Sequence, residues 1–184
     1  MIATSVHAEV LGPSFDRLPP LLRGFHDARP RKEFNGRCSV TSGHGLLART
    51  IALLASLPRR SHDDIAVHVV IERRDGREIS ECRETWTRRF GEQRMQSIVR
   101  PGRDGLEERF GPIVLTFDLT LEVDRIVWRL KRARLLFIPL PKALFAGCGA
   151  FETIVDGRYC FDARAGMAGI GQLVHYRGWL TEHG

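Results

Sequence analysis

The stretch 110-FGPIVLTFDLTLEVDRIVWRLKRARLLFIPLP-141 decides the fold that the sequence predicts. From Val114 to Val123, residues of odd number are apolar and alternate with Val, Thr, Asp and Glu. This two-residue period is typical of a β-strand with one buried face. A turn is expected at Asp124-Arg125, and a second strand begins at Ile126. The stretch therefore predicts one long β-hairpin.

The second strand of this hairpin changes its apolar face partway along. Its apolar residues are Ile126, Trp128 and Leu130 on one parity, and then Ala133, Leu135 and Phe137 on the other. A β-bulge near Lys131-Arg132 would produce that change, because it inserts one extra residue, bends the strand and increases its twist. Two long strands that twist and bend in this way predict a strongly curved sheet.

Strand signals continue on both sides of the hairpin. Strands are expected at about residues 64–73, 79–90, 95–99, 106–110, 151–155, 158–163 and 170–180, and residues 32–41 could form a further short one. Asp75-Gly76 and Asp156-Gly157 are signals for two-residue hairpin turns. About nine strands with short connections indicate an up-and-down antiparallel sheet.

Two helices are expected before the main run of strands. Ser14 is a candidate N-cap for the first, in which Phe15, Leu18, Leu22 and Phe25 recur at helical spacing. The second runs from about His44 to Leu57 and is apolar on most sides. We expect this second helix to be buried and to lie in or across the mouth of the curved sheet.

These elements predict an α+β fold with a flexible arm at residues 1–13 and a single domain at residues 14–184. The sheet is expected to be strongly curved or to form a half-open β-barrel, lipocalin-like or lipoprotein-carrier-like, with the second helix lodged against its concave face. A cup of this kind commonly leaves an apolar cavity. A chain of 184 residues with 43% hydrophobic residues is long enough for such a core.

Composition narrows the possible partners. The net charge is +6, but charges of both signs are interleaved, which argues against a nucleic-acid partner. No secretory signal and no apolar run of membrane-spanning length is recognisable, so we expect a cytoplasmic protein. The four cysteines lack metal-ligand spacing and are expected to be free thiols, so no metal is predicted. No other cofactor is predicted either.

Five segments resemble a bacterial family of unknown function. They are Glu84-x-Trp-x-Arg-x-Phe90, Leu106 to Pro112, Ile138 to Pro141, Asp156 to Asp162 and His175 to Leu180. The similarity covers roughly residues 15–180, and members of the family occur alone or fused behind saccharopine-dehydrogenase-like domains. The resemblance implies no activity, although it suggests an interaction domain for a dehydrogenase-like partner as one hypothesis. No G-x-G-x-x-G follows a strand, so a Rossmann half is excluded.

Three sets of side chains are candidates for a site inside the cup. They are Glu84, Trp86, Arg88 and Phe90; Glu107 and Arg109; and His175, Arg177 and Trp179, each set sharing one parity of its strand. If the three sets face the same interior, they form a Trp/Arg/Glu/His cluster, to which Trp128 and Tyr176 would add contacts. The structural alternative is a plug in which arginine stacks on tryptophan and is neutralised by glutamate.

Two functions follow from this cluster, and the sequence leaves open whether the protein is an enzyme. The first is binding of an apolar or amphipathic small molecule in the cupped sheet. The second is a cofactor-free isomerase, cyclase or dehydratase. In that enzyme Arg88 and Arg177 would hold a carboxylate or enolate, His175 or Glu84 would move a proton, and Tyr176 would be an auxiliary donor.

Overall fold

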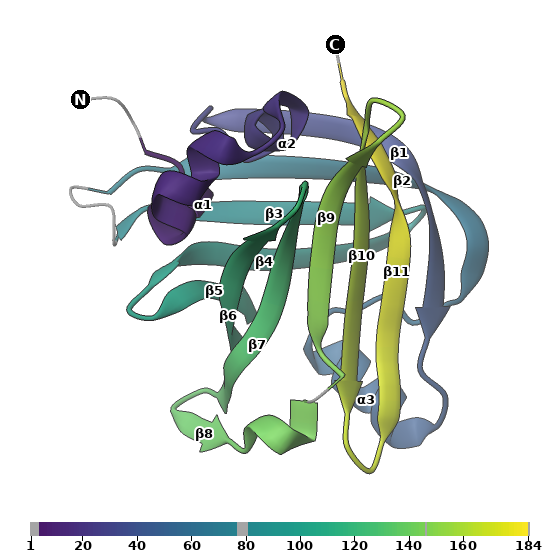
Figure 1. Ribbon diagram of the computed structural model, residues 1–184. Coiled ribbons are helices and arrows are strands. Elements are labelled where there is room, and N and C mark those ends of the chain that lie inside the picture. The colour runs from purple at the N-terminus through teal and green to yellow at the C-terminus, as the bar shows by residue number, and fades with distance from the viewer. Residues whose placement is uncertain (1–3, 77–80, 146, 184) are drawn as a thin grey trace.

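The protein forms a closed antiparallel β-barrel in the computed structural model, which describes residues 4–76, 81–145 and 147–183 (Figure 1). Along the sheet the order of strands is β6-β5-β4-β3-β2-β1-β11-β10-β9-β7, and pairing of β6 with β7 closes the ring. β8 pairs only with the far end of β7. The strands are β1 (Arg31–Ser42), β2 (His62–Arg74), β3 (Arg83–Phe90), β4 (Gln93–Gly102), β5 (Gly105–Phe110), β6 (Ile113–Glu122), β7 (Arg125–Leu135), β8 (Ile138–Leu140), β9 (Gly149–Val155), β10 (Arg158–Met167) and β11 (Gly171–Glu182). The predicted α+β class with a strongly curved up-and-down sheet is confirmed, and the sheet closes completely.

The long hairpin is present as β6 and β7, with its turn one residue earlier than predicted. Glu122 pairs with Arg125, so the turn residues are Val123 and Asp124. The predicted bulge is also present, since Thr116 pairs with Arg132 and Phe117 with Leu130. Lys131 is therefore the extra residue, and it moves the apolar face of β7 from one parity to the other.

The far end of this hairpin was predicted wrongly. Ala133 is buried, but Leu135 is half-exposed and Phe137 is 95% exposed. β7 ends at Leu135, and the chain turns there into the short strand β8. Residues 136–137, which were included in the predicted strand, therefore form a turn at the rim of the barrel and have no buried face.

The N-terminal segment is a structured cover over one end of the barrel. Residues 6–11, expected in a flexible arm, form α1 (Val6–Leu11), whose cap is the Ser5 hydroxyl accepting from the Ala8 amide at 3.0 Å. Instead of one helix from Ser14, the chain forms a 3-10 turn (Gly12–Arg17) and α2 (Pro20–Phe25). The prolines at positions 13, 19 and 20 explain this division, because proline is tolerated only in the first turn of a helix.

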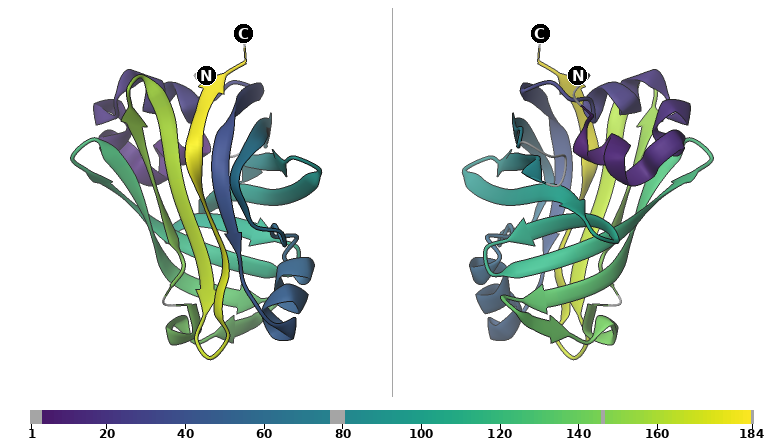
Figure 2. Two further views of the ribbon diagram at one scale, coloured as in Figure 1. Left: turned by 90° about the vertical axis from the view of Figure 1, so that its right-hand side faces the viewer. Right: turned by 90° about the vertical axis from the view of Figure 1, so that its left-hand side faces the viewer.

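The apolar second helix lies at the opposite end (Figure 2). α3 (Leu46–Leu54) buries its alanine face through Ala48 and Ala52. The expectation that it is buried on most sides was wrong, because Leu46, Leu47, Leu53 and Leu54 are 57% to 85% exposed. The small side chains let the helix lie close against the barrel while the leucines point outward.

The connection between β2 and β3 is longer than the predicted two-residue turn at Asp75-Gly76. Arg74 pairs with Arg83, so eight residues, 75–82, link the two strands. Ile79, expected at the start of the second of these strands, lies outside the described residues. A further short 3-10 helix, Lys142–Phe145, follows β8.

Two glycines allow close backbone contact where β1 and β11 pair. A Cβ on Gly36 would lie 1.8 Å from the Trp179 carbonyl oxygen, and one on Gly178 would lie 2.2 Å from the Arg37 carbonyl oxygen. Glycine at such positions lets strands bend sharply in a small barrel. The contact therefore explains why this pair of strands carries glycine inside its ladder.

Candidate ligand-binding cavity

An apolar cavity of about 120 Å³ lies inside the barrel. Aromatic residues dominate the wall, among them Phe25, Trp86, Phe90, Phe117, Trp128 and Tyr159. α2 contributes Phe25 at one end, whereas α3 and the residues after it contribute Ile51, Ala55 and Leu57 at the other. A cavity of this size is larger than the single-water voids of ordinary cores.

β3 supplies the part of the wall that the sequence predicted correctly. Glu84, Trp86, Arg88 and Phe90 are all buried. Trp86, Arg88 and Phe90 line the cavity. The ring of Trp86 makes an edge contact with that of Trp128, which was also predicted to lie inside, at a centroid distance of 6.5 Å.

Arg88 is held by a buried ion pair and by a tryptophan. Its Nη2 donates to Glu108 Oε1 at 3.1 Å, and its Nη1 donates to Ser97 Oγ at 2.9 Å. The Ser97 hydroxyl also donates to Glu108 Oε1, at 2.7 Å. The guanidinium carbon lies 4.8 Å from the centre of the Trp86 ring. This arrangement matches the predicted stack of arginine on tryptophan, neutralised by a glutamate.

The glutamate in that pair is not the one that the sequence suggested. Glu107 and Arg109 were expected inside, but β5 places Leu106, Glu108 and Phe110 on the inner face. Glu107 instead accepts from Arg100 at 2.7 Å on the outer surface, and Arg109 donates to the Gly111 carbonyl. Glu108, interpreted from the sequence as a solvated side chain, is 6% exposed.

β11 likewise presents the opposite face from the one predicted. Val174, Tyr176 and Leu180 line the cavity, so His175, Arg177 and Trp179 point away from it. His175 Nε2 lies 3.0 Å from Asp162 Oδ1, and Trp179 lies beneath Arg158 at 4.4 Å on the outer surface. The interior therefore does not contain the proposed catalytic residues His175 and Arg177, whereas Tyr176 does face inward.

Tyr176 contributes a phenol to this interior. Its ring centre lies 5.4 Å from that of Phe90. Burial raises the pKa of Tyr176 to about 12, so the hydroxyl is protonated at neutral pH. The cavity therefore contains a neutral hydrogen-bonding group from β11 in place of the predicted imidazole and guanidinium.

A second buried polar group was missed by sequence analysis. Glu152 of β9 lines the cavity, and its Oε2 lies 2.6 Å from Nε2 of His26. The hydroxyl of Tyr159 lowers the pKa of this carboxyl, and the nearby indole Nε1 of Trp128 is buried without a hydrogen-bond partner among the described residues. His7 stacks on His26 with ring centroids 3.7 Å apart. No sequence motif links these residues, because α1, the end of α2 and β9 come together only in the closed barrel.

Burial controls the protonation of this group. It raises the pKa of the Glu152 carboxyl, an effect that the nearby His7 partly offsets. It lowers the pKa of His26, and the Lys32 ammonium lowers it further. For His7 the pKa is again lowered well below its ordinary value by burial, with a contribution from His26. Both imidazoles are therefore neutral at neutral pH.

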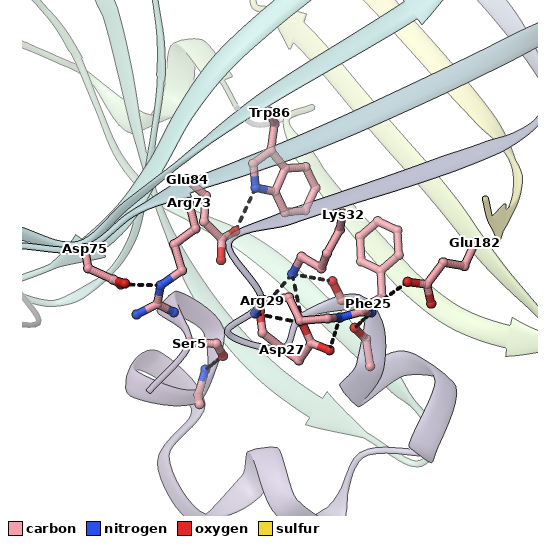
Figure 3. Close-up of polar contacts among 12 residues, drawn as sticks. Ser5, Phe25, Asp27, Arg29, Lys32, Arg73, Asp75, Glu84, Trp86 and Glu182 are labelled. Carbon is pink, nitrogen blue, oxygen red and sulfur yellow. Dashed lines mark hydrogen bonds and ion pairs between the residues drawn. The ribbon is translucent and has the colours of Figure 1, made fainter. Parts of the chain in front are cut away.

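Glu84 does not line the cavity and lies among the polar side chains near Trp86, Arg73 and Lys32 (Figure 3). Trp86 Nε1 donates to Glu84 Oε2 at 2.8 Å, which turns the indole ring toward the cavity and the carboxylate toward α1 and α2. Lys32 Nζ donates to the carbonyl oxygens of Phe25 and Asp27, both at 2.8 Å. Burial raises the pKa of Glu84 and lowers that of Lys32. Glu84 was predicted to be catalytic, but it supports the wall instead of lining the cavity.

The described residues contain no cluster of three or more His, Cys, Asp or Glu side chains that could hold a metal ion. Within the part of the chain that the structure describes, Cys38, Cys148 and Cys160 form no disulfide, and the side chains of Cys38 and Cys82 are buried. Within the same residues, no helix is long and apolar enough to cross a membrane.

The protein is a closed β-barrel with an apolar interior. Two polar groups interrupt that interior, the Arg88–Glu108 pair and the Glu152–His26 pair. The chain belongs to the family described as a domain of unknown function (DUF4166), whose model matches residues 18–180. This confirms the predicted resemblance; the fusion to saccharopine-dehydrogenase-like domains is not shown by the match. No curated protein matches the chain. The crystal structure of Rv2717c from M. tuberculosis is similar at 12% identity and a TM-score of 0.45, over 91% of this chain and 99% of that one.

Proposed function

We propose that the protein binds an apolar or amphipathic small molecule inside the barrel. The observation that supports this proposal is the cavity of about 120 Å³ between Trp86, Trp128 and the inner end of α3. Protein interiors are normally packed without such space, because each void loses contacts and costs stability. A barrel interior that keeps an aromatic void and also carries polar groups is typical of a binding site.

Apolar contact would supply most of the affinity. Burying one methylene group contributes about 0.8 kcal/mol. A straight-chain ligand should therefore bind about fourfold more tightly for each added methylene until the cavity is full. The polar groups of the wall are fixed in place, since Arg88 bonds to Ser97 and Glu108, and Glu152 bonds to His26. Such preorganisation lowers the entropic cost of binding.

The neutral fluorescent probe N-phenyl-1-naphthylamine tests the proposal. The probe should bind the purified protein saturably with one site per chain, and energy transfer from the buried tryptophans should report its position. Linear alcohols should displace it with increasing strength as the chain lengthens. Absence of saturable binding, or displacement that does not depend on chain length, would count against a binding cavity.

A second candidate function is proton-transfer catalysis in the same cavity. Glu152 favours it, because this carboxyl faces an apolar space, has a raised pKa and is bonded to His26. Glu152 would then be the general base for an isomerase acting on an apolar substrate. Deuterium exchange at the α-carbon of ketone probes should occur in the wild type and be lost in Glu152→Gln. Exchange that is equal in the two proteins would argue against this candidate.

A further inference from the structure

The charged side chains on the cavity surface indicate which polar group a ligand can carry. Four of them line the cavity: Arg88, Glu108, Glu152 and Arg164. A ligand with a charged head needs an opposite charge that is free, because an unpaired ion in an apolar site loses its hydration without compensation. The partners of the two arginines therefore decide whether an anion can bind.

Arg88 has no free charge to offer. Glu108 neutralises it at 3.1 Å, and both groups are buried, with the Ser97 hydroxyl bridging them. A ligand carboxylate could reach Arg88 only by competing with a carboxylate that is covalently fixed in the wall. The pair therefore acts toward a ligand as a neutral dipole.

Arg164 lies at the rim. Its side chain is 60% exposed and is paired with Asp162 at 3.1 Å. Solvent screens a charge in that position, so it adds little to the affinity for an anion. Two further buried cations do not line the cavity: Lys32 donates to the backbone carbonyl oxygens of Phe25 and Asp27, and Arg73 is paired with Asp75.

Glu152 is different, because among the described residues its only ion-pair partner is His26, and the Arg88 charge lowers its pKa without a direct contact. Its direct partner His26 is a neutral imidazole, and the remaining neighbours of the carboxylate are the Tyr159 phenol and the Trp128 indole. The Tyr176 phenol adds another uncharged donor to the wall. Each of these groups can bond to a hydroxyl, and none carries the positive charge that would compensate a carboxylate for its lost hydration.

We propose that the cavity selects apolar molecules with a hydroxyl or amine head and rejects carboxylates of the same chain length, because Glu108 already occupies its one interior arginine. This inference rests on the proposed binding function and specifies its ligand class. It distinguishes this barrel from one in which an interior arginine is free to hold a fatty acid.

Displacement of N-phenyl-1-naphthylamine by octanol, octylamine and octanoate tests the selection. Octanol and octylamine should each displace the probe at a concentration at least about tenfold below that of octanoate, a difference of about 1.4 kcal/mol. Octanoate that displaces the probe equally well or better would overturn the inference while leaving the binding function intact. Failure of the probe itself to bind would instead contradict the binding function.

Glu108→Gln gives a gain-of-function test. The substitution removes the charge that neutralises Arg88, so the affinity for octanoate relative to octanol should rise at least about tenfold over that of the wild type. Glu107→Gln is the matched control, because the neighbouring side chain lies on the outer surface and should change neither ligand. An unchanged affinity for octanoate relative to octanol in a folded Glu108→Gln protein would overturn the inference.

Glu152→Gln provides a second test if Glu108→Gln does not fold, as circular dichroism would show. Removing the carboxylate should reduce the affinity for octylamine at least about threefold relative to octanol, because the amine loses its only unneutralised anionic partner. An unaltered ratio of the affinities for octylamine and octanol would contradict the placement of the ligand's head group beside Glu152.

Discussion

The imidazole rings of His7 and His26 stack 3.7 Å apart inside the end of the barrel that α1 and α2 cover. Both side chains are fully buried. His26 bonds to Glu152, whereas neither ring nitrogen of His7 has a hydrogen-bond partner among the described residues. A stacked pair of neutral imidazoles beside the Lys32 ammonium cannot readily accept a proton, so the N-terminal cover is sensitive to acid.

We predict that His7→Phe makes the protein more resistant to acid. The folded-state pKa of His7 lies below its unfolded value of about 6.5, so the unfolded chain binds more protons below that pH. In the wild type, the neutral His7 therefore makes its full contribution to the free energy of unfolding at pH values above the unfolded pKa. This contribution is lost as the pH falls toward the folded pKa. The loss can reach about 1.4 kcal/mol per pH unit for each histidine.

Urea unfolding of the two proteins between about pH 5 and pH 8 checks this prediction. The difference between variant and wild type reports on His7 together with its coupling to His26 and Glu152, whereas Glu84, whose pKa is raised, acts with the opposite sign in both proteins. The advantage of His7→Phe should grow as the pH falls below about 6.5. An advantage that is the same at every pH would show that His7 is not a neutral buried group.

Arg88→Met should destabilise the protein by about 3–5 kcal/mol, because it leaves the buried Glu108 carboxylate without its cation. The double variant Arg88→Met, Glu108→Leu should recover much of that loss. Chemical unfolding followed by circular dichroism measures both. If the single and double variants lose the same free energy, the pair does not couple as the structure indicates.

Gly36→Ala should cost about 1–3 kcal/mol, since the added Cβ would lie 1.8 Å from the Trp179 carbonyl oxygen and force β1 and β11 apart. Gly24→Ala is the matched control. Gly24 lies inside α2 with open space around it, so the same change should stabilise the helix by about 0.5–1 kcal/mol. Equal effects of the two substitutions on the free energy of unfolding would contradict the close contact of the strands.

The exposed face of α3 gives a further prediction. Leu47→Gln should change the free energy of unfolding by less than about 0.5 kcal/mol, because this side chain is 67% exposed. Ala52→Leu should cost about 1–3 kcal/mol, since it forces a larger side chain between the helix and the barrel. A large loss for Leu47→Gln would mean that the helix buries its leucines, as the sequence suggested.

The strands were predictable because local alternation is enough to define them. The period-two pattern of β6 and the change of parity at Lys131 gave both the hairpin and its bulge. The same logic failed for β11, where polar or aromatic residues occupy both faces. Glu108 shares its parity with Leu106 and Phe110, so the alternation of β5 indicated that Glu108 and not Glu107 faces inward, and the sequence prediction chose the wrong parity.

The candidate site was only partly predictable for a related reason. Trp86, Arg88 and Trp128 lie on strands with clear alternation, and they were placed inside correctly. His26 and Glu152 are 126 positions apart, and their contact depends on how the N-terminal segment closes the barrel. The burial of α3 was overestimated because its leucines contribute to an apolar composition without indicating which face meets the sheet.

Probe binding to Ala163→Phe tests the central claim most directly. Ala163 faces the cavity from β10, so the added ring should occupy the space and weaken binding of N-phenyl-1-naphthylamine at least about tenfold. Cys160→Phe, on the outer face of the same strand, should leave binding unchanged. We expect only the inward substitution to block the probe, and equal binding by both variants would contradict a ligand site inside the barrel.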